Sequence, residues 1–352
     1  MSVQRSHLQV IAAIDFFCGS GGLTRGLMDA GIRVIAGFDI DRRCRCTYEK
    51  NNHPARFYAK DVRALTKKDL APLIKGIPRL DLLFAGCAPC QSFSQQRKAE
   101  TPRPDATLLV AFARLVEAFK PGQVLVENVP GLTRVAGFSA YRRFIRVLES
   151  LGYLFAEGTL DAKYFGVPQT RRRYVLIAMR KEQPTLPERI TGVRGQPFAT
   201  VRDALSHYPP IAAGERHTRI PNHVAASISE KNLLRLRHTP HDGGDRRSWP
   251  DELTLNCHRN NNTGHTDVYG RMAWDSPAPT LTGRCHSISN GRYGHPSQDR
   301  AISLREAASL QTFRDDYIFY GSNKNVALQI GNSVPVRLAE LLGRHILSLS
   351  AT

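Results

Sequence analysis

Two cysteines three residues apart could carry nucleophilic or redox chemistry in this chain. Cys87 and Cys90 stand in the segment GCAPCQSFS, which follows the apolar run 80–85. A loop after the carboxyl end of a parallel strand lines the ligand crevice of an open α/β sheet, so a thiolate there is a candidate nucleophile. The same C-x-x-C spacing suits a dithiol redox pair. A third interpretation is a pair of inert buried thiols.

A carboxylate and two arginines offer acid–base chemistry and anion binding. Glu127 opens the segment ENVPG directly after the apolar run 123–126. A carboxyl group that faces a crevice at a strand terminus can act as a general acid, although a solvated loop carboxylate gives the same pattern. The segment QTRRR precedes another apolar run, and on extended backbone Arg171 and Arg173 point to the same side.

The segment DFFCGSGG, residues 15–22, predicts a strand that runs into a glycine turn and then a helix. Glycines there let a ligand approach the backbone at the amino end of the helix. Asp39 follows Gly19 by 20 residues, at the end of the next apolar run, where a carboxylate can bond a ribose. These features favour a nucleoside-containing cofactor. A dinucleotide fingerprint would require glycine at position 24, so Thr24 makes NAD a poor fit.

The elements that position these residues alternate between apolar runs and helical patterns. This order predicts an α/β fold with a mostly parallel, Rossmann-like sheet and crossover helices. A loop suited to a hairpin joins the last two runs, which predicts an antiparallel strand. The predicted strands are residues 10–17, 33–40, 81–86, 123–129, 155–162 and 172–180.

After residue 181 the pattern changes to Pro, Gly, Asn, Asp and His, which indicates a smaller, loop-rich second domain. Helical patterning returns where Ser303 and Glu306 form a capping-box signature, and again toward the C-terminus. We therefore expect a discontinuous first domain at 1–181 and 314–352, and a small domain at 182–313.

Composition narrows the class of protein. The 352 residues include 49 Lys and Arg against 31 Asp and Glu, a formal charge of +18, which favours DNA or RNA as a partner. A hydrophobic share of 41% excludes a disordered or fibrous chain. No apolar run is long enough to predict a membrane span, and seven cysteines without a signal peptide indicate a reducing cytoplasm. Two adjacent Cys–His pairs lack zinc-ligand spacing, so we expect no metal site.

Five segments together resemble the ordered motif set of the bacterial-type DNA cytosine-5 methyltransferases: DFFCGSGG, APCQSFS, ENVPG, QTRRR and QIGNSVP. Each segment alone is a weak indication, but all five occur in the family's order. The resemblance spans residues 11–181 and 276–345. It implies an enzyme that methylates carbon 5 of cytosine in a specific duplex DNA sequence, with S-adenosylmethionine as the methyl donor.

The resemblance also implies a cofactor site. The methionine part would lie near the glycine turn and the ribose on Asp39. Ile40 replaces an aromatic residue that many members stack on adenine, and Asp61 would bond the adenine amino group. The implied cofactor-binding residues are Phe16, Gly19, Gly21, Asp39, Ile40, Asp61, Val62, Asn332 and Ser333.

The chemistry explains the residue types. Carbon 5 of cytosine is not nucleophilic, so a soft sulfur must first add to carbon 6. The resemblance assigns that step to Cys90 and proton donation at ring nitrogen 3 to Glu127. Arg173 would bond the base oxygen, and Arg171 would support the pocket electrostatically.

Such chemistry cannot reach a base inside a duplex, so the base must be flipped out. Gln91 and Ser94 are implied contacts to the extruded nucleotide, and a variable module at about 182–275 would read the sequence. We expect a monomer in the bacterial cytoplasm, associated with the nucleoid. It would be the modification enzyme of a restriction–modification system, acting on the same site as a cognate endonuclease, or an orphan methylase.

Three alternatives stay open from the residues. A tRNA cytosine-5 methyltransferase is the nearest, although the long variable module and ENVPG favour DNA. A thiol-redox protein would use Cys87 and Cys90 and leave the other motifs unexplained. A catalytically inactive DNA-binding member is disfavoured because Cys90, Glu127 and both arginines occur together.

Overall fold

The computed structural model describes residues 10–88, 106–133, 138–259 and 267–351. The chain forms two compact units. Unit 1 comprises Met1–Leu160, Arg172–Glu188 and Leu338–Thr352. Unit 2 comprises Asp161–Arg171 and Arg189–Arg337.

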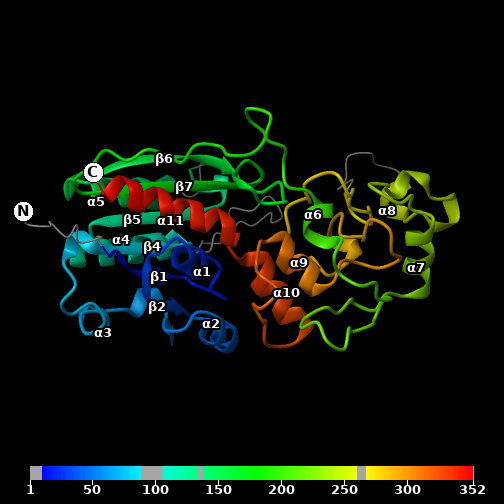
Figure 1. Ribbon diagram of the computed structural model, residues 1–352, viewed down its shortest axis with the longest axis horizontal. Helices are drawn as coiled ribbons and strands as arrows, with labels where there is room; N and C mark the ends of the chain where they lie inside the picture. The colour runs from blue at the N-terminus through cyan, green and yellow to red at the C-terminus, as the bar shows by residue number, and fades with distance from the viewer. Residues whose placement is uncertain (1–9, 89–105, 134–137, 260–266, 352) are drawn as a thin grey trace, which may run out of the picture. The chain divides into compact units, whose positions relative to one another are not determined.

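Unit 1 is built on a seven-stranded sheet in the order β3-β2-β1-β4-β5-β7-β6 (Figure 1). Strands β1 to β5 pair in parallel, and β7 pairs antiparallel with β5. The predicted α/β fold, mostly parallel with an antiparallel strand, is confirmed. The strands are β1 Ala12–Phe16, β2 Arg33–Asp39, β3 Arg56–Ala59, β4 Leu82–Gly86, β5 Gln123–Asn128, β6 Leu154–Asp161 and β7 Arg172–Met179.

The edge strand β3 was not among the predicted strands. It has four residues, RFYA, and only Phe57 among them is fully buried. A strand this short, with one buried side chain, carries no apolar run that a sequence pattern could detect.

One face of the sheet carries the main apolar core. Two strand side chains on this face contact rings of α4, Phe16 against Phe112 and Phe84 against Phe119, and Phe144 of α5 belongs to the same cluster. Strand residues alternate between the two faces, so the residues between these positions point to the opposite face. The helices of unit 1 are α1 Gly22–Asp29, α2 Arg45–Asn51, α3 Lys67–Leu70, α4 Ala106–Phe119, α5 Phe138–Ser150 and most of α11 Val336–Ser350.

The opposite face is covered by α1, α2 and α11, and α11 crosses it toward the viewer in Figure 1. Glycines allow close packing here. A side chain at Gly37 would collide with the Tyr48 ring of α2, and one at Gly343 of α11 would lie 2.7 Å from the Cβ atom of Ala30. The two layers of helices hold the sheet rigidly, which fixes the ends of its strands.

Unit 2 is rich in loops, as the sequence predicted for this region. Its helices are short: α6 Val201–Leu205, α7 Glu230–Arg237, α8 Asn256–Arg259, α9 Leu304–Leu310 and α10 Asn323–Asn332. The predicted capping box of α9 is confirmed, since the Ser303 hydroxyl accepts a bond from the Glu306 N–H and the Glu306 carboxylate accepts one from the Ser303 N–H. A smaller apolar cluster gathers around Trp249 and Tyr269.

Residues 314–337 pack with unit 2, whereas the sequence analysis placed them in the first domain. The cause is apolar packing, because Val326 and Ile330 of α10 share one buried cluster with Leu304 and Leu310 of α9. The boundary therefore falls inside α11. Across the ranges the structure describes, no helix has the length and apolar character needed to cross a membrane.

Candidate active site

The carboxyl ends of β1, β2, β4 and β5 meet at one edge of the sheet. The pairing register aligns Phe16 with Phe38 and with Gly86, and Gly86 with Val126. Backbone pairing continues past Gly86, because the Cys87 N–H donates to the Phe16 carbonyl at 3.2 Å. The glycine turn, Asp39, Cys87 and Glu127 accordingly lie at the same edge.

Side-chain alternation then places several polar groups on one face. Asp15 pairs with Ala85, and Ala85 pairs with Leu125, so these three side chains share a face. Cys87 and Glu127 each come two residues further along their strands and therefore point the same way. This face is the one that α1 and α2 cover. The candidate reacting groups lie on it at the carboxyl ends of the strands.

The glycine turn is organised by Asp39. Its carboxylate accepts bonds from the Gly19 N–H at 2.9 Å and from the Asp41 N–H at 2.8 Å. Gly19 and Gly21 both have positive φ angles, of 50° and 95°, which glycine adopts without strain. A side chain at Gly19 would meet no atom within 4 Å, so open space lies above the turn. A carboxylate has lone pairs beyond these two bonds, and Asp39 can still accept from a ribose hydroxyl.

Below the turn, Asp15 forms a buried polar group that the sequence analysis did not assign. One carboxylate oxygen accepts a bond from the Thr24 hydroxyl at 2.6 Å, while the other, Oδ1, is buried without a hydrogen-bond partner. Burial raises the pKa of Asp15 to about 7. Thr24, the residue that breaks the dinucleotide fingerprint, is therefore the donor to this carboxyl group. In the sequence, only the alternation of side chains along β1 indicates that Asp15 shares a face with the site.

The turn and its carboxylates fit a nucleoside cofactor. The space above Gly19, the acceptor capacity of Asp39 and the orphan oxygen of Asp15 are features that a ligand with hydroxyl and amino donors would satisfy. Ile40 follows Asp39 with 67% of its surface exposed, which leaves an apolar side chain open to a flat ring. Phe16 is fully buried in the core, so only its backbone can face a ligand.

The other two candidate cofactor-binding residues of unit 1 are Asp61, with a partly exposed carboxylate, and Val62, with a buried side chain. The Asp61 carboxylate accepts bonds from the Arg63 N–H and guanidinium, and this arginine lowers the pKa of Asp61. Asp61 thereby caps the short 3-10 helix η2 Val62–Ala64 and stays partly exposed. The Val62 side chain is buried in the main core, so only its backbone can contribute to binding.

Glu127 and Arg173 form a pair at this edge. Arg173 Nε lies 3.1 Å from Glu127 Oε1, and both side chains are largely buried. The antiparallel register aligns Glu127 with Val175, which brings Arg173 to the same face two residues away. The structure thus joins two residues that the sequence analysis had assigned to one site.

Cys87 lies beside Glu127 and is a poor nucleophile. Burial, together with the negative charge of Glu127, raises the pKa of the Cys87 thiol well above its usual value. The thiolate is the reactive form of cysteine, and a raised pKa keeps this side chain as a thiol. Cys90, Gln91 and Ser94 fall within 89–105 and lie outside the described residues.

Arg171 has different surroundings from Arg173. Its buried guanidinium donates to the carbonyl oxygens of Leu281 at 2.9 Å, Gly331 at 3.0 Å and Ser333 at 3.1 Å. These partners belong with Arg171 to unit 2, whereas Arg173 belongs to unit 1. The two arginines share a strand face in sequence, but the chain passes from one unit to the other between them.

The last two cofactor candidates lie in the segment that Arg171 holds. Asn332 ends α10 with an exposed side chain, and the Ser333 hydroxyl donates to the Gln329 carbonyl at 2.6 Å. Gly331 is packed so closely against Thr282 that a Cβ atom would lie 2.2 Å from its backbone. The backbone here is fixed by tight packing and by the Arg171 bonds.

The sequence is similar to those of known proteins over almost its whole length. The family model of the C-5 cytosine-specific DNA methylases matches residues 11–348. The chain is 38% identical over 341 residues to the type II methylase M.HgiDII of Herpetosiphon aurantiacus, which covers 95% of this chain and 94% of that protein. It is 31% identical to the type II methyltransferase M1.BsuMI of Bacillus subtilis, over 94% of this chain and 79% of that protein.

Solved structures share the fold. A protein described as a DNA modification methyltransferase of an Escherichia coli prophage superposes with a TM-score of 0.73 at 23% identity, over 96% of this chain and 99% of that one. A DNMT2 variant of Spodoptera frugiperda has a TM-score of 0.63 at 15% identity, over 96% and 99% of the two chains. The fold is that of a DNA methyltransferase. By its sequence the chain belongs to the C-5 cytosine-specific DNA methylases, and it is a DNA (cytosine-5)-methyltransferase.

Proposed function

We propose that this enzyme methylates cytosine in a specific duplex sequence through a covalent bond from Cys90 to carbon 6, as the modification partner of a type II restriction endonuclease. The observation that carries the proposal is the Glu127–Arg173 pair, with Nε and Oε1 3.1 Å apart, at the strand edge that also bears the glycine turn. The names of the type II relatives support the biological setting. We further propose that it acts as a monomer in the bacterial cytoplasm.

The glycine turn and Asp39 would hold S-adenosylmethionine, with Ile40, Asp61 and the backbone of Phe16 and Val62 around it. When bound, the cofactor supplies an electrophilic methyl group. Asp39 keeps its two backbone bonds while it accepts from the ribose, so the ligand meets a turn that is already ordered. Asn332 and Ser333 are proposed to contribute from the segment fixed by Arg171.

In the proposed reaction the Cys90 thiolate forms a bond to carbon 6, and the ring electron pair moves toward nitrogen 3. Glu127 donates its proton to nitrogen 3 and becomes a carboxylate, which Arg173 stabilises at 3.1 Å. Carbon 5 would then take the methyl group from the sulfonium of the cofactor, which would leave as S-adenosylhomocysteine, and nitrogen 3 would return its proton to Glu127. Loss of the carbon 5 proton to solvent and departure of the Cys90 sulfur from carbon 6 restore the aromatic ring.

Arg171 is proposed to act as a positioning residue. Its guanidinium faces three carbonyl oxygens rather than an open edge, so its contribution is to fix the segment that contains Ser333. Gln91 and Ser94, next to the nucleophile in sequence, are proposed contacts to the extruded nucleotide.

Sequence reading is proposed to rest on residues 182–275, within the small domain 182–313, while 1–181 and 314–352 bind the cofactor. Exchanging 182–275 for the same module of a relative should change which cytosines are methylated and leave cofactor affinity nearly unchanged. The measurement is bisulfite sequencing of plasmid DNA together with a cofactor titration. A folded chimera that keeps the old target would contradict the assignment.

The covalent route is tested by trapping. A recognised duplex that carries 5-fluorocytosine lacks the proton whose loss releases the enzyme, so with S-adenosylmethionine it should leave a denaturation-resistant adduct on the peptide that contains Cys90. C90S should form no adduct, because a serine hydroxyl is a far weaker nucleophile than a thiolate. Adduct on another residue would overturn the route. Transfer to tRNA in preference to DNA would favour the RNA alternative.

A further inference from the structure

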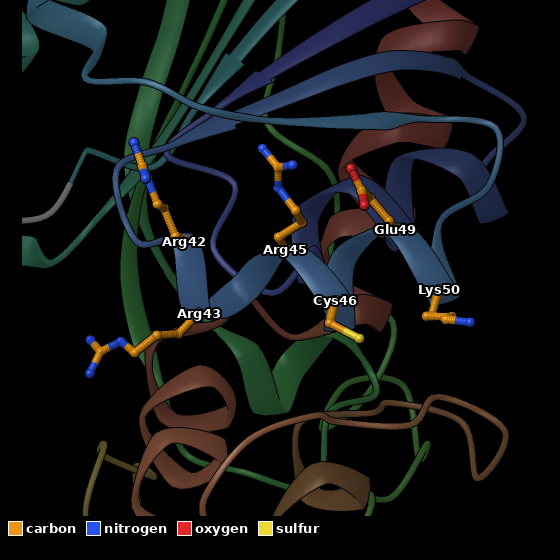
Figure 2. Close-up of a pocket in the computed structure, with 6 residues that line it drawn as sticks. All are labelled: Arg42, Arg43, Arg45, Cys46, Glu49 and Lys50. Atoms are coloured by element: carbon orange, nitrogen blue, oxygen red, sulfur yellow. The ribbon is translucent and has the colours of Figure 1, made fainter.

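A group of basic side chains follows β2 directly. The 3-10 helix η1 Arg42–Cys44 begins three residues after Asp39, and α2 continues from it. These elements form a surface pocket, called the basic pocket below, which Figure 2 shows. Its lining contains four cationic residues and one acidic residue: Arg42, Arg43, Arg45, Lys50 and Glu49, together with Cys46.

Most of this positive charge is not neutralised by neighbouring acids. Arg43 forms an ion pair with Asp41 at 2.7 Å. Arg42, Arg45 and Lys50 are exposed, and within the described ranges none of them forms an ion pair with an acid. Some other exposed cations of unit 1 do have acidic partners, as in the pairs Arg63–Asp61 and Arg344–Glu340. The basic pocket therefore has an excess of positive charge that a bound anion would offset.

The backbone beneath the pocket is fixed. Cys44, Thr47 and Tyr48 are buried on the inner side of η1 and α2, and the Asp41 carboxylate caps η1 by accepting from the Arg43 N–H. Arg45 also lies over the Phe57 ring, with its guanidinium carbon 5.8 Å from the ring centroid. Cations that project from an anchored backbone lose less entropy when they bind an anion.

Two of the guanidinium groups point the same way. Arg42 and Arg45 are three residues apart and extend to one side of the helical segment, along with Glu49 (Figure 2). A planar guanidinium offers paired donors that match the oxygens of a phosphate. Two such groups outnumber the single carboxylate of Glu49 on this side, so the net charge there favours an anion such as phosphate over a metal cation.

We propose that the basic pocket binds a backbone phosphate of the DNA substrate. The location supports this partner, since η1 starts at the edge of the sheet where β2 ends at Asp39 and where Glu127 lies near the end of β5. DNA whose cytosine reaches Glu127 must approach that edge. The inference rests on the proposed role of Glu127 for the direction of approach and on family membership for DNA as substrate. Phosphate contacts position the duplex and carry no sequence information.

The test compares two variants that lose the same charge. In full-length enzyme, R42Q/R45Q should reduce the slope of log affinity against log salt by about 1, since each phosphate neutralised contributes about 0.9. The matched control is K75Q/R79Q, because Lys75 and Arg79 are exposed and precede β4, at the opposite edge of the sheet. The control should keep the wild-type slope. The probes are duplexes with and without the methylated sequence, measured between roughly 50 and 200 mM salt.

Each outcome decides the proposal. Both duplexes should weaken by the same factor in R42Q/R45Q, and R42K/R45K should recover most of the slope because the charge is kept. Equal slope losses in the control and the test variant would show a general charge effect and overturn the proposal that the basic pocket binds a phosphate. An unchanged slope in R42Q/R45Q would overturn it too. If wild-type enzyme shows no salt-dependent DNA binding, the proposed function fails instead.

A cofactor titration guards against damage to the nearby turn. R42Q/R45Q should bind S-adenosylmethionine as the wild type does, since neither guanidinium contacts Asp39 in a described bond. If cofactor affinity falls, the single variant R45Q replaces the pair, because Arg45 lies in α2 away from the Asp39 turn. Its salt slope should then fall by about half as much, and an unchanged slope would contradict the proposal.

Discussion

The two units bury charge in opposite ways. Unit 1 fills the space between its sheet and its helices with apolar and aromatic side chains, and the buried charged side chains among its described residues are the carboxyl groups of Asp15 and Glu127. Unit 2 instead encloses four arginines with essentially no exposed surface: Arg171, Arg271, Arg300 and Arg305. Each of these donates to backbone carbonyls, and Arg300 also holds the buried Glu306 carboxylate with two bonds of 2.7 Å.

This difference teaches how to interpret a basic composition. A short-helix, loop-rich unit leaves many carbonyl oxygens without partners in regular structure, and buried guanidinium groups satisfy them. Arg271 alone donates to the carbonyls of Thr239, Leu236 and His295. Part of the positive charge that suggested nucleic-acid contacts thus serves as internal scaffold. Removing a buried arginine from unit 2 should then affect stability, whereas removing the charge of Glu127 at the strand edge of unit 1 should affect function.

The largest effect is expected at Glu127. E127Q cannot donate the proton that stabilises the addition product, so single-turnover methylation should slow by about 10²- to 10⁴-fold. Glutamine keeps an acceptor toward Arg173, so the free energy of unfolding should change by less than about 2 kcal/mol. Rapid-quench methylation and urea unfolding measure the two quantities. If E127Q instead lost several kcal/mol of unfolding free energy, the slower rate could reflect damage to the fold, and the contrast between function in unit 1 and stability in unit 2 would fail.

The corresponding change in unit 2 is R300M. It leaves Glu306 buried without its ion-pair partner and should reduce the free energy of unfolding by about 3–5 kcal/mol. The matched control is R247M, because the Arg247 side chain is 88% exposed and solvent screens its pair with Asp245, so its loss should change the free energy of unfolding far less. Urea unfolding gives both values, and similar losses in the two variants would contradict the scaffold role.

Asp15 provides a pH test within unit 1. Burial raises the pKa of its carboxyl group from 3.8 to about 7, so its stabilising contribution is complete below pH 3.8 and disappears as the pH rises through 7. D15N keeps an acceptor for the Thr24 hydroxyl and cannot ionise. Wild type should lose up to about 1.4 kcal/mol per pH unit relative to D15N between roughly pH 4 and 7. A stability difference that does not vary with pH would contradict the shifted pKa.

The smallest effect is expected at Cys87. Because the pKa of its thiol is raised well above the usual value, we expect that Cys87 does not supply the reacting sulfur. C87S should form the 5-fluorocytosine adduct at a rate within about threefold of wild type, as measured by gel mobility after denaturation. Loss of the adduct in C87S, with C90S unaffected, would reverse the assignment of the nucleophile.

Particular residues show how far the sequence could lead. Apolar runs predicted six of the seven strands, because central parallel strands are continuous hydrophobic segments, whereas β3 has a single fully buried side chain. The pairing of Glu127 with Arg173 depends on the antiparallel register of β5 and β7, which no local pattern specifies. Likewise, Arg171 and Arg173 look equivalent in QTRRR. Only the tertiary course of the chain separates the buried clamp of Arg171 from Arg173, which pairs with Glu127.

The clamp around Gln169 and Arg171 constrains how new specificities can arise in such enzymes. Gln169 bonds to the N–H of Leu281 and to the Gln311 side chain, and Arg171 holds the carbonyls of Gly331 and Ser333. None of these partners falls in 182–275. Recombination between relatives with both crossovers inside that stretch would leave every clamp bond intact, whereas a crossover downstream of it would combine mismatched halves of the clamp. We therefore expect that evolution can exchange the proposed reading module as a single unit.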